Sequence, residues 1–360
     1  MIAASHPAAA TAPAALTSRR STAPLRRATV VPARRAAAAA SALTCRAEGE
    51  REKMVVAVTG ATGFVGKKLV ESLLADGHEV RVLTRNAISA RLAMPQATLA
   101  GAKFYAWDTM SGAIEWYEAV KGCTGVVNLA GAPISNPWDE EYKRTLVKSR
   151  VTTTKRLADA INAIPEGERP SLVSSSAVGY YGISNKGEFD ERSRPGRDFL
   201  ADLCTRWEKA AAEAKTTTTV VRTGVVLEKD GGALGKILPI FQLYTGGPLG
   251  SGKQWVSWIH RDDLVALIVA ALEEPKKYAG VINGVAPEPT TMNGLCDSVA
   301  AATNRPNWLP VPGFAVRALL GEGATVVLDG QRVLPKRAES LGFEFEYKTV
   351  DQAMEAIVKA

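Results

Sequence analysis

Residues 54–66 read MVVAVTGATGFVG and contain the pattern that decides the fold. The apolar, β-branched run MVVAVTG (54–60) predicts a buried parallel strand that ends at a glycine. Three glycines then follow in the spacing GxxGxxG, namely Gly60, Gly63 and Gly66. A glycine-rich turn directly after a buried strand is the start of a dinucleotide-binding unit.

The segments after the turn complete that unit. KKLVESLLADGH (67–78) has the apolar spacing of a helix, and EVRVLTRN (79–86) predicts a second strand. In such a unit the first glycine permits the tight turn, the second lets the backbone approach the pyrophosphate, and the third lets the helix pack on the strand. The helix N-terminus supplies unpaired N–H groups for the phosphates. A purely structural turn is the alternative, but the complete strand–turn–helix–strand context favours cofactor binding.

The second strand ends in Thr84–Arg85, where NAD-binding proteins carry an acid. A carboxylate at this position accepts hydrogen bonds from the ribose 2′-hydroxyl of NAD, whereas an arginine matches a 2′-phosphate. Thr84 and Arg85 therefore favour NADP, although Arg85 as an ordinary surface charge remains the alternative.

The alternation of strands and helices continues along the chain. KFYAWD (103–108) predicts a third strand, with Asp108 near the expected adenine, and GVVNLAG (125–131) predicts a fourth. The small end of the fourth strand, Leu129–Ala130–Gly131, lets a cofactor ribose pass closely. An amphipathic helix is expected over 138–163; its Arg150 is either a solvated charge or a cofactor contact.

The later segments are expected to form a fifth strand, a sixth strand and a C-terminal lobe. SLVSSS (171–176) predicts the fifth strand and VVRTGVVL (220–227) the sixth. LGKILPIFQLYTGG (234–247) is helix-like, and PLGSGKQWVSWIH (248–260) is rich in turns and strand-like. Such a lobe closes over the carboxyl ends of the strands, where ligands bind in these sheets.

The net charge of +7 comes from the first 47 residues. They contain seven arginines and no acid, and the rest of the chain has 37 basic and 37 acidic residues. Nothing in that remainder indicates a nucleic-acid partner. The leader is rich in Ala, Ser, Thr and Pro, which predicts a chloroplast transit peptide over 1–47 with cleavage near Cys45–Ala47; a disordered native tail is the alternative.

Metal and membrane sites are not indicated. Cys123, Cys204 and Cys296 are far apart without a CxxC motif, and the three histidines are scattered. The longest apolar run, LVALIVAAL (264–272), is far shorter than the ~20 residues of a membrane span and predicts a buried helix. His260 is expected to join strand to helix, with Asp262 or Asp263 capping the helix.

These segments together resemble the extended short-chain dehydrogenase/reductase superfamily, also called NAD-dependent epimerases/dehydratases, and within it the atypical branch known as 39U. The resemblance covers roughly residues 54 to 355. The matching motifs are TGATGFVG (59–66), NLAG (128–131), SSSAVGYYG (174–182), RTGVVL (222–227), GGPLGSGKQWVSWIH (246–260), WIHRDD (258–263), NGVAPEPTT (283–291), RPNWLPVP (305–312) and DGQRVLPKR (329–337).

The resemblance implies an α/β fold: a Rossmann-type, doubly wound parallel sheet with a smaller C-terminal α+β substrate lobe. Its implied organisation is an NADP-binding domain over 54–227, a substrate lobe with returning Rossmann elements over 228–300, and a C-terminal epimerase-family module over 305–355. The predicted NADP(H) contacts, from the turn and from the resemblance, are Gly60, Thr62, Gly63, Phe64, Gly66, Thr84, Arg85, Asp108, Leu129, Ala130, Gly131, Arg150 and Val226.

The family's usual proton-transfer pair, Tyr-x-x-x-Lys, is absent. The helix FLADLCTRWEKAA (199–211) carries Leu200 at the tyrosine position and Cys204 at the lysine position. Ser176 matches the family's catalytic serine, and Tyr181 is a candidate replacement donor with Lys186 as its cation. Hydroxyl residues also terminate strands by bonding to local backbone, so both roles stay open. On the same helix, Glu208 is expected to be a buried hydrogen-bonding acid.

The function expected from this reading is that of a plastid NADP(H)-binding epimerase-family protein, an oxidoreductase or isomerase acting on an unidentified small molecule. The alternative is an NADP(H)-sensing regulatory or scaffold protein of the chloroplast, with a protein partner linked to plastid division. Loss of the Tyr-x-x-x-Lys pair favours the alternative, and the complete C-terminal lobe favours the enzyme.

Overall fold

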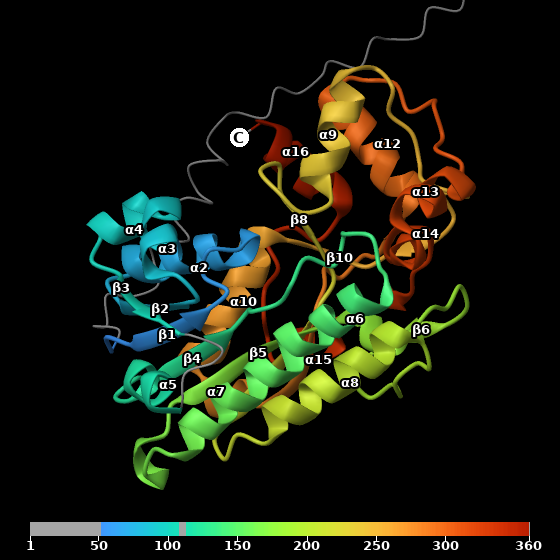
Figure 1. Cartoon of the computed structure of the whole chain (residues 1–360). Helices are drawn as coiled ribbons and strands as arrows, with labels where there is room; N and C mark the ends of the chain where they lie inside the picture. The colour runs from blue at the N-terminus through green and yellow to red at the C-terminus, as the bar shows by residue number, and fades with distance from the viewer. Residues whose placement is uncertain (1–51, 108–112, 360) are drawn as a thin grey trace, which may run out of the picture. The chain divides into compact units, whose positions relative to one another are not determined.

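The computed structural model describes residues 52–107 and 113–359. Lys53–Ala360 form one compact unit, drawn in Figure 1. The predicted transit peptide over 1–47 and the predicted adenine contact Asp108 lie outside the described residues.

A seven-stranded parallel sheet forms the centre of this unit, so the predicted Rossmann-type fold is confirmed. The strand order is β3-β2-β1-β4-β5-β7-β11. From β1 the chain adds strands toward β3, and from β4 it adds them in the opposite direction, toward β11. Ligands bind in such sheets at the point where the strand order reverses, here between β1 and β4. The strands are β1 (Val55–Thr59), β2 (Glu79–Thr84), β3 (Lys103–Ala106), β4 (Gly125–Asn128), β5 (Ser171–Ala177), β7 (Thr218–Thr223) and β11 (Gly280–Gly284).

Helices cover both faces because side chains alternate across each strand. In β1, Val56 and Val58 pack in one apolar cluster and Ala57 packs in another. The first cluster includes α2 (Phe64–Ala75) and α10 (Arg261–Glu273); the second includes α5 (Ala113–Val120), α7 (Thr153–Asn162) and α8 (Phe199–Ala212). Figure 1 shows α7 and α8 running side by side.

The helix expected over 138–163 contains a π-helical turn. It consists of α6 (Glu140–Val147), the π turn η1 (Lys148–Thr152) and α7. Asp139 caps its start by accepting a hydrogen bond from the Tyr142 N–H at 2.6 Å. A π turn inside an α-helix is frequently found at functional sites, and this one carries Arg150.

The single strand expected over 220–227 is wrong, because the chain leaves the sheet at Gly224. β7 ends at Thr223, and β8 (Val225–Leu227) pairs in parallel with β10 (Trp258–His260) instead. A Cβ at Gly224 would lie 2.4 Å from the carbonyl oxygen of Ser257. Only glycine permits this close approach. β8 therefore leaves the main sheet and pairs with β10.

The remaining elements surround a separate apolar cluster or connect the sheet. In that cluster α9 (Leu234–Gln242), α12 (Met292–Thr303) and α16 (Val350–Lys359) pack around Trp258. Besides these three helices, the remaining elements are α3 (Ala87–Ala93), α4 (Pro95–Leu99), η2 (Glu166–Glu168), η3 (Val178–Tyr181), β6 (Glu188–Phe189), β9 (Trp255–Val256), α11 (Pro275–Tyr278), β12 (Thr290–Thr291), α13 (Gly313–Leu320), η4 (Glu322–Ala324), α14 (Thr325–Leu328), β13 (Arg332–Val333) and α15 (Lys336–Ser340). Within the described ranges, no helix has the length and apolar character needed to cross a membrane.

Candidate functional site

The glycine turn between β1 and α2 has a shape that only glycine permits at two positions. Gly60 has a positive φ of 67°, and a Cβ there would lie 2.5 Å from the carbonyl oxygen of Leu129. A Cβ at Gly66 would lie 2.3 Å from the carbonyl oxygen of Gly60. The chain after β4 therefore passes directly against the turn, and α2 packs directly against the end of β1, as expected of the first and last glycines.

The middle of the turn is open to the surface. Thr62 and Gly63 are exposed, and the Gly63 N–H donates to the carbonyl oxygen of Gly60 at 2.9 Å. Gly63 is also the N-cap of α2 and has no side chain to bind the first N–H groups of the helix. Phe64 packs its ring on Gly231, where a Cβ would come within 2.5 Å of it. Phe64 is half-buried and lines the cleft beside the turn.

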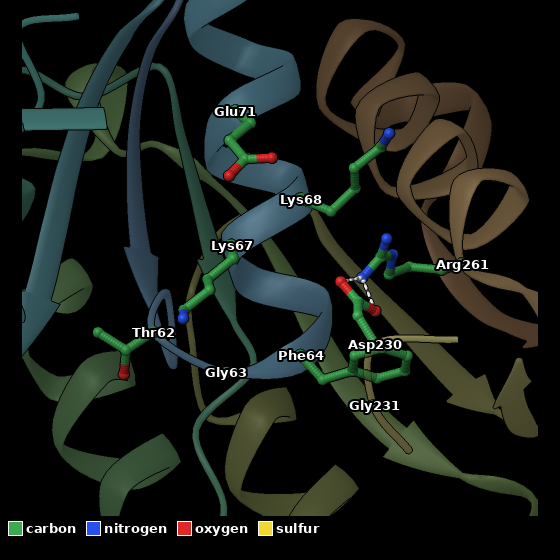
Figure 2. Close-up of a pocket in the computed structure, with 9 residues that line it drawn as sticks. All are labelled: Thr62, Gly63, Phe64, Lys67, Lys68, Glu71, Asp230, Gly231 and Arg261. Carbon is green, nitrogen blue, oxygen red and sulfur yellow. Dashed lines mark hydrogen bonds and ion pairs between the residues drawn. The ribbon is translucent and has the colours of Figure 1, made fainter. Parts of the chain in front are cut away.

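A cleft of about 340 Å³ lies beside this turn and the first turns of α2. Figure 2 shows the charged side chains on its walls: the cations Lys67, Lys68 and Arg261, and the acids Glu71 and Asp230. The open turn thus borders a cleft in which cations meet exposed backbone N–H groups, the combination that binds phosphate.

Arg85 follows the end of β2 at the same edge of the sheet. Thr59 pairs with Leu83, so the glycine turn and Thr84–Arg85 leave neighbouring strands at the same level. Arg85 is exposed, and none of the described carboxylates forms an ion pair with it. Its guanidinium is therefore available to a ligand at this edge.

Arg150 lies beside the chain that follows β4. Its guanidinium donates to the carbonyl oxygens of Ala132 at 3.0 Å and Leu146 at 3.3 Å, and lies 5.4 Å from the centroid of the Trp207 ring. A Cβ at Gly131 would lie 3.0 Å from the guanidinium carbon. Burial lowers the pKa of Arg150, and no carboxylate among the described residues pairs with it. An arginine in this state is suited to an anionic or carbonyl group of a ligand.

Leu129, Ala130 and Val226 contact the apolar clusters on the two faces of the sheet. The Leu129 N–H donates to the carbonyl oxygen of Thr59 at 3.2 Å. Leu129 and Val226 pack against the apolar cluster of α2 and α10, whereas Ala130 packs against the cluster on the opposite face. The predicted contacts thus lie at or just after the ends of β1, β2 and β4, and in β8.

Ser176 belongs to a buried polar cluster at the carboxyl ends of β5 and β7. Its hydroxyl donates to Glu208 Oε1 at 2.7 Å. Arg222 donates to both carboxylate oxygens of Glu208 at 2.8 Å, and the two side chains are only 4% and 13% exposed. Glu208 is therefore a hydrogen-bonding acid as expected, but it is partly rather than fully buried. Because Ser176 donates its proton to Glu208, its oxygen can act only as an acceptor toward any further partner.

Tyr181 is bound inside the same cluster. Its hydroxyl donates to Asn283 Oδ1 at 2.6 Å and accepts from Arg222 Nη1 at 3.1 Å, and its ring stacks on Phe189. Burial raises the pKa of Tyr181 to about 12, so the phenol stays protonated at neutral pH. The side chain is 3% exposed. Its position gives it a clear role in holding the cluster together, whereas a role as proton donor to a substrate gains no support.

Replacing Tyr181 with phenylalanine is expected to lower the free energy of unfolding by about 1–3 kcal/mol, the cost of leaving buried polar groups unpaired. Asn283 Oδ1 would lose its donor, and one Arg222 N–H would lose its acceptor. Urea denaturation followed by circular dichroism measures the change. The half-buried neighbour Tyr180, replaced in the same way, is the control, and an equal effect of the two substitutions would contradict the assigned role.

A buried hydrogen-bond network that was not predicted from the sequence lies at the ends of β1 and β4. Asn128 accepts from the Thr59 hydroxyl at 2.8 Å and donates to Thr154 Oγ1 at 2.7 Å. Trp207 Nε1 donates to the same Thr154 oxygen at 2.9 Å. An asparagine inside the apolar strand GVVN is the signal that could have revealed this network, since a buried amide needs several partners.

His260 joins β10 to α10 as expected, but the expected helix cap is wrong. His260, and neither aspartate, caps the helix: its Nδ1 accepts from the Asp262 N–H at 3.1 Å. The Asp263 carboxylate instead accepts from the backbone N–H groups of Glu346 and Tyr347 at 2.9 and 3.1 Å. His260, the last residue of β10, already supplies the acceptor at the N-cap position. Asp263 instead binds the C-terminal segment at Glu346 and Tyr347.

The comparison with protein families identifies the chain. The model described as "NAD dependent epimerase/dehydratase family" matches residues 56–283. The chain belongs to this family. A second model, described as a domain of unknown function (DUF1731), matches residues 311–357.

Relatives of this epimerase family match along most of the chain. "Epimerase family protein SDR39U1 homolog, chloroplastic" from Arabidopsis thaliana is 51% identical over 318 residues, which are 88% of this chain and 89% of the relative. "Epimerase family protein SDR39U1" from Homo sapiens is 36% identical over 312 residues, 85% of this chain and all of the relative. The resemblance to the 39U branch is therefore confirmed.

A solved structure of the epimerase family has the same fold. The crystal structure of human epimerase family protein SDR39U1 (isoform 2) with NADPH superposes with a TM-score of 0.74 at 35% identity. The match covers 85% of this chain and 99% of the human one.

In this epimerase-family member, Leu200 and Cys204 lie where the sequence reading placed the family's Tyr-x-x-x-Lys pair. A Cβ at Gly179 would lie 3.2 Å from the Leu200 Cβ and 3.9 Å from the Cys204 Sγ, so both positions of α8 face the turn η3. Burial raises the pKa of the Cys204 thiol to about 12, so it is not a thiolate at neutral pH. Over the ranges that the structure describes, no group of three or more His, Cys, Asp and Glu is arranged to hold a metal.

Proposed function

We propose that the chain binds NADP(H) and acts in the plastid as an oxidoreductase or isomerase on a small molecule, by chemistry that does not use a Tyr-x-x-x-Lys pair. The observation that carries the proposal is the glycine turn. Gly60, in the left-handed region and against Leu129, holds Thr62 and Gly63 exposed at the N-terminus of α2. The human relative, crystallised with NADPH, supports the choice of nucleotide.

The residues around the turn fit an NADP(H) molecule. The free N–H groups at the start of α2 suit its pyrophosphate. Arg85 suits the adenosine 2′-phosphate at the end of β2. Arg150, half-buried beside Gly131 and paired with no carboxylate among the described residues, suits the part of the cofactor that passes β4. NADP(H), when bound, supplies or accepts a hydride.

The polar cluster formed by Ser176, Glu208 and Arg222 can hold a substrate hydroxyl. Ser176 Oγ donates to Glu208, so it accepts a hydrogen bond from a substrate O–H rather than donating one to a carbonyl. Arg222 keeps Glu208 in place through two hydrogen bonds of 2.8 Å. We propose that Ser176 positions the substrate oxygen and that Glu208 and Arg222 orient Ser176.

In the principal binding test, the full-length chain is expected to bind NADPH at least tenfold more tightly than NADH. Arg85→Ala is expected to weaken NADPH binding by about tenfold to a hundredfold and to leave NADH binding unchanged, because a charged hydrogen bond is worth about 1.5–3 kcal/mol. NADPH fluorescence and calorimetry measure both affinities. Equal affinity for the two nucleotides, or an equal loss of both in Arg85→Ala, would contradict the assigned 2′-phosphate contact.

The alternative, an NADP(H)-sensing scaffold, is favoured by one observation. The Ser176 and Tyr181 hydroxyls both donate to buried partners within the protein. A screen of alcohols with NADP+ and of carbonyl compounds with NADPH, followed by the change in NADPH absorbance, separates the two proposals. Turnover that Ser176→Ala abolishes while NADPH binding persists supports the enzyme. NADPH binding without turnover on any compound, together with a partner retained from plastid extract only when NADPH is present, supports the scaffold.

The proposed plastid location rests on the composition of residues 1–47 and on the chloroplastic label of the Arabidopsis relative. Fusion of residues 1–47 to a fluorescent protein is expected to direct it to the chloroplast. Diffuse cytosolic fluorescence from that fusion would overturn the proposed transit peptide.

A further inference from the structure

Three cations line the cleft beside the glycine turn, and two of them are already neutralised (Figure 2). Lys68 forms an ion pair with Asp262 at 3.2 Å. Arg261 donates to both oxygens of Asp230 at 2.6 and 2.8 Å and pairs with Glu228 at 3.3 Å. These two cations balance acids of the protein itself, so they add little net attraction for an anionic ligand.

Lys67 is the cation of this cleft whose charge is not balanced. It is exposed on the first turn of α2, and no carboxylate within residues 52–107 and 113–359 pairs with it. Glu71 lies four residues later and lines the same cleft, but the two form no ion pair. Figure 2 shows the Lys67 ammonium directed to the side of Thr62, whereas Lys68 and Arg261 lie on the other side of the helix. The free charge thus lies beside the open part of the turn.

Lys67 also borders the segment that follows Arg85. A second cleft, about 170 Å³ in volume, is lined by Lys67, by Glu71 and by residues 93–97, where α3 ends and α4 begins. α3 starts at Ala87, two residues after Arg85. The turn and Arg85 leave neighbouring strands at one level, and Lys67 lines a cleft on the side of each of them. The edge where these two strands end is the place of the adenosine ribose and its 2′-substituent in a Rossmann unit.

We propose that Lys67 is a second cation for the adenosine 2′-phosphate of NADP(H), opposite Arg85; this inference rests on the proposed function. A phosphate dianion attracts two cations more strongly than one, and the ribose hydroxyl of NAD gains nothing comparable. A lysine on a flexible stem suits this position because it acts as a point charge and needs no planar geometry. Lys67 would then determine specificity for NADP over NAD without contributing to the hydride step.

The experiment compares Lys67→Met with Lys68→Met in the full-length chain. Methionine keeps most of the side-chain length and removes the charge, and Lys68 is the matched control because it is the next residue of the same helix and lines the same cleft. Lys67→Met is expected to raise the Kd for NADPH about tenfold and the Kd for NADH less than about twofold, the loss of one charged hydrogen bond. Lys68→Met is expected to leave the ratio of the two Kd values unchanged.

A second measurement tests the phosphate directly. Adenosine 2′,5′-bisphosphate and 5′-AMP, used as competitors of NADPH fluorescence, differ only in the 2′-phosphate. Lys67→Met is expected to weaken the bisphosphate about tenfold and to spare 5′-AMP, with an unchanged melting temperature as the check on folding. Unchanged NADPH affinity in Lys67→Met, or equal losses for both competitors, would overturn the inference while the proposed function stood. Failure of the unmodified chain to bind NADPH would overturn the proposed function and this inference together.

Discussion

Replacing Glu208 with alanine is expected to lower the free energy of unfolding by about 3–5 kcal/mol, the largest stability effect expected in this molecule. Arg222 would keep a buried positive charge with its bidentate partner removed, since its side chain is only 4% exposed. Ser176 would also lose its acceptor. Removal of one partner of a buried ion pair is costly because the remaining charge stays desolvated.

Urea denaturation of the Glu208→Ala chain measures this effect, and the pair Asp202–Arg206 provides the control. That pair lies on the same helix α8, with side chains 63% and 51% exposed and a distance of 3.6 Å. Asp202→Ala is expected to cost less than about 1 kcal/mol because exposed pairs are weak. The double replacement Glu208→Leu with Arg222→Met is expected to recover part of the loss, since it leaves no unpaired charge. A Glu208→Ala effect no larger than that of Asp202→Ala would show that the pair does not hold the cluster.

Replacing Gly66 with valine is expected to weaken NADPH binding about a hundredfold or more. The first side-chain atom would lie 2.3 Å from the carbonyl oxygen of Gly60 and 2.7 Å from the Cα of Ala61, so the turn or the start of α2 must move. Displacing the turn removes at least two backbone hydrogen bonds to the phosphates, each worth about 1.5 kcal/mol or more. Overpacking is expected to lower the free energy of unfolding by about 1–3 kcal/mol as well.

Calorimetric titration with NADPH and urea denaturation measure the two consequences of Gly66→Val. Gly167→Val is the matched control, because nothing lies within 4 Å of a Cβ at that exposed position and its φ is not positive. NADPH affinity within twofold of the unmodified chain in Gly66→Val would mean that the nucleotide does not bind at this turn.

The Rossmann sheet and its glycine turn were predictable because their signals are local. A β-branched strand, three glycines and a helix occupy consecutive residues, so spacing alone places them together. The absence of the Tyr-x-x-x-Lys pair was readable for the same reason, since Leu200 and Cys204 lie on one helix. The break at Gly224 was missed because its cause, the backbone of Ser257, lies 33 residues further along the chain.

The partners of the polar side chains could not be read from the sequence. Ser176 and Glu208 come from β5 and α8, Tyr181 and Asn283 are 102 residues apart, and all of them meet through Arg222 or its partners. Their residue types indicated that these side chains form hydrogen bonds, but not which residues are their partners. Tyr181, a candidate proton donor from its sequence position, is buried and stabilises the cluster because its hydroxyl binds Asn283 and Arg222.

The amino-acid sequence by itself determined the family, the sheet, the position of the glycine turn and the loss of the usual proton-transfer pair, because each depends on the identity and spacing of neighbouring residues. Only the tertiary structure decided which charges remain free. Lys68, Arg261 and Arg222 are neutralised by acids. Among the described residues, half-buried Arg150, Lys67 on α2 and Arg85 after β2 have no acid partner. The physical reason is that a charge acts over a few ångströms in space, and the fold alone sets which groups lie within that distance.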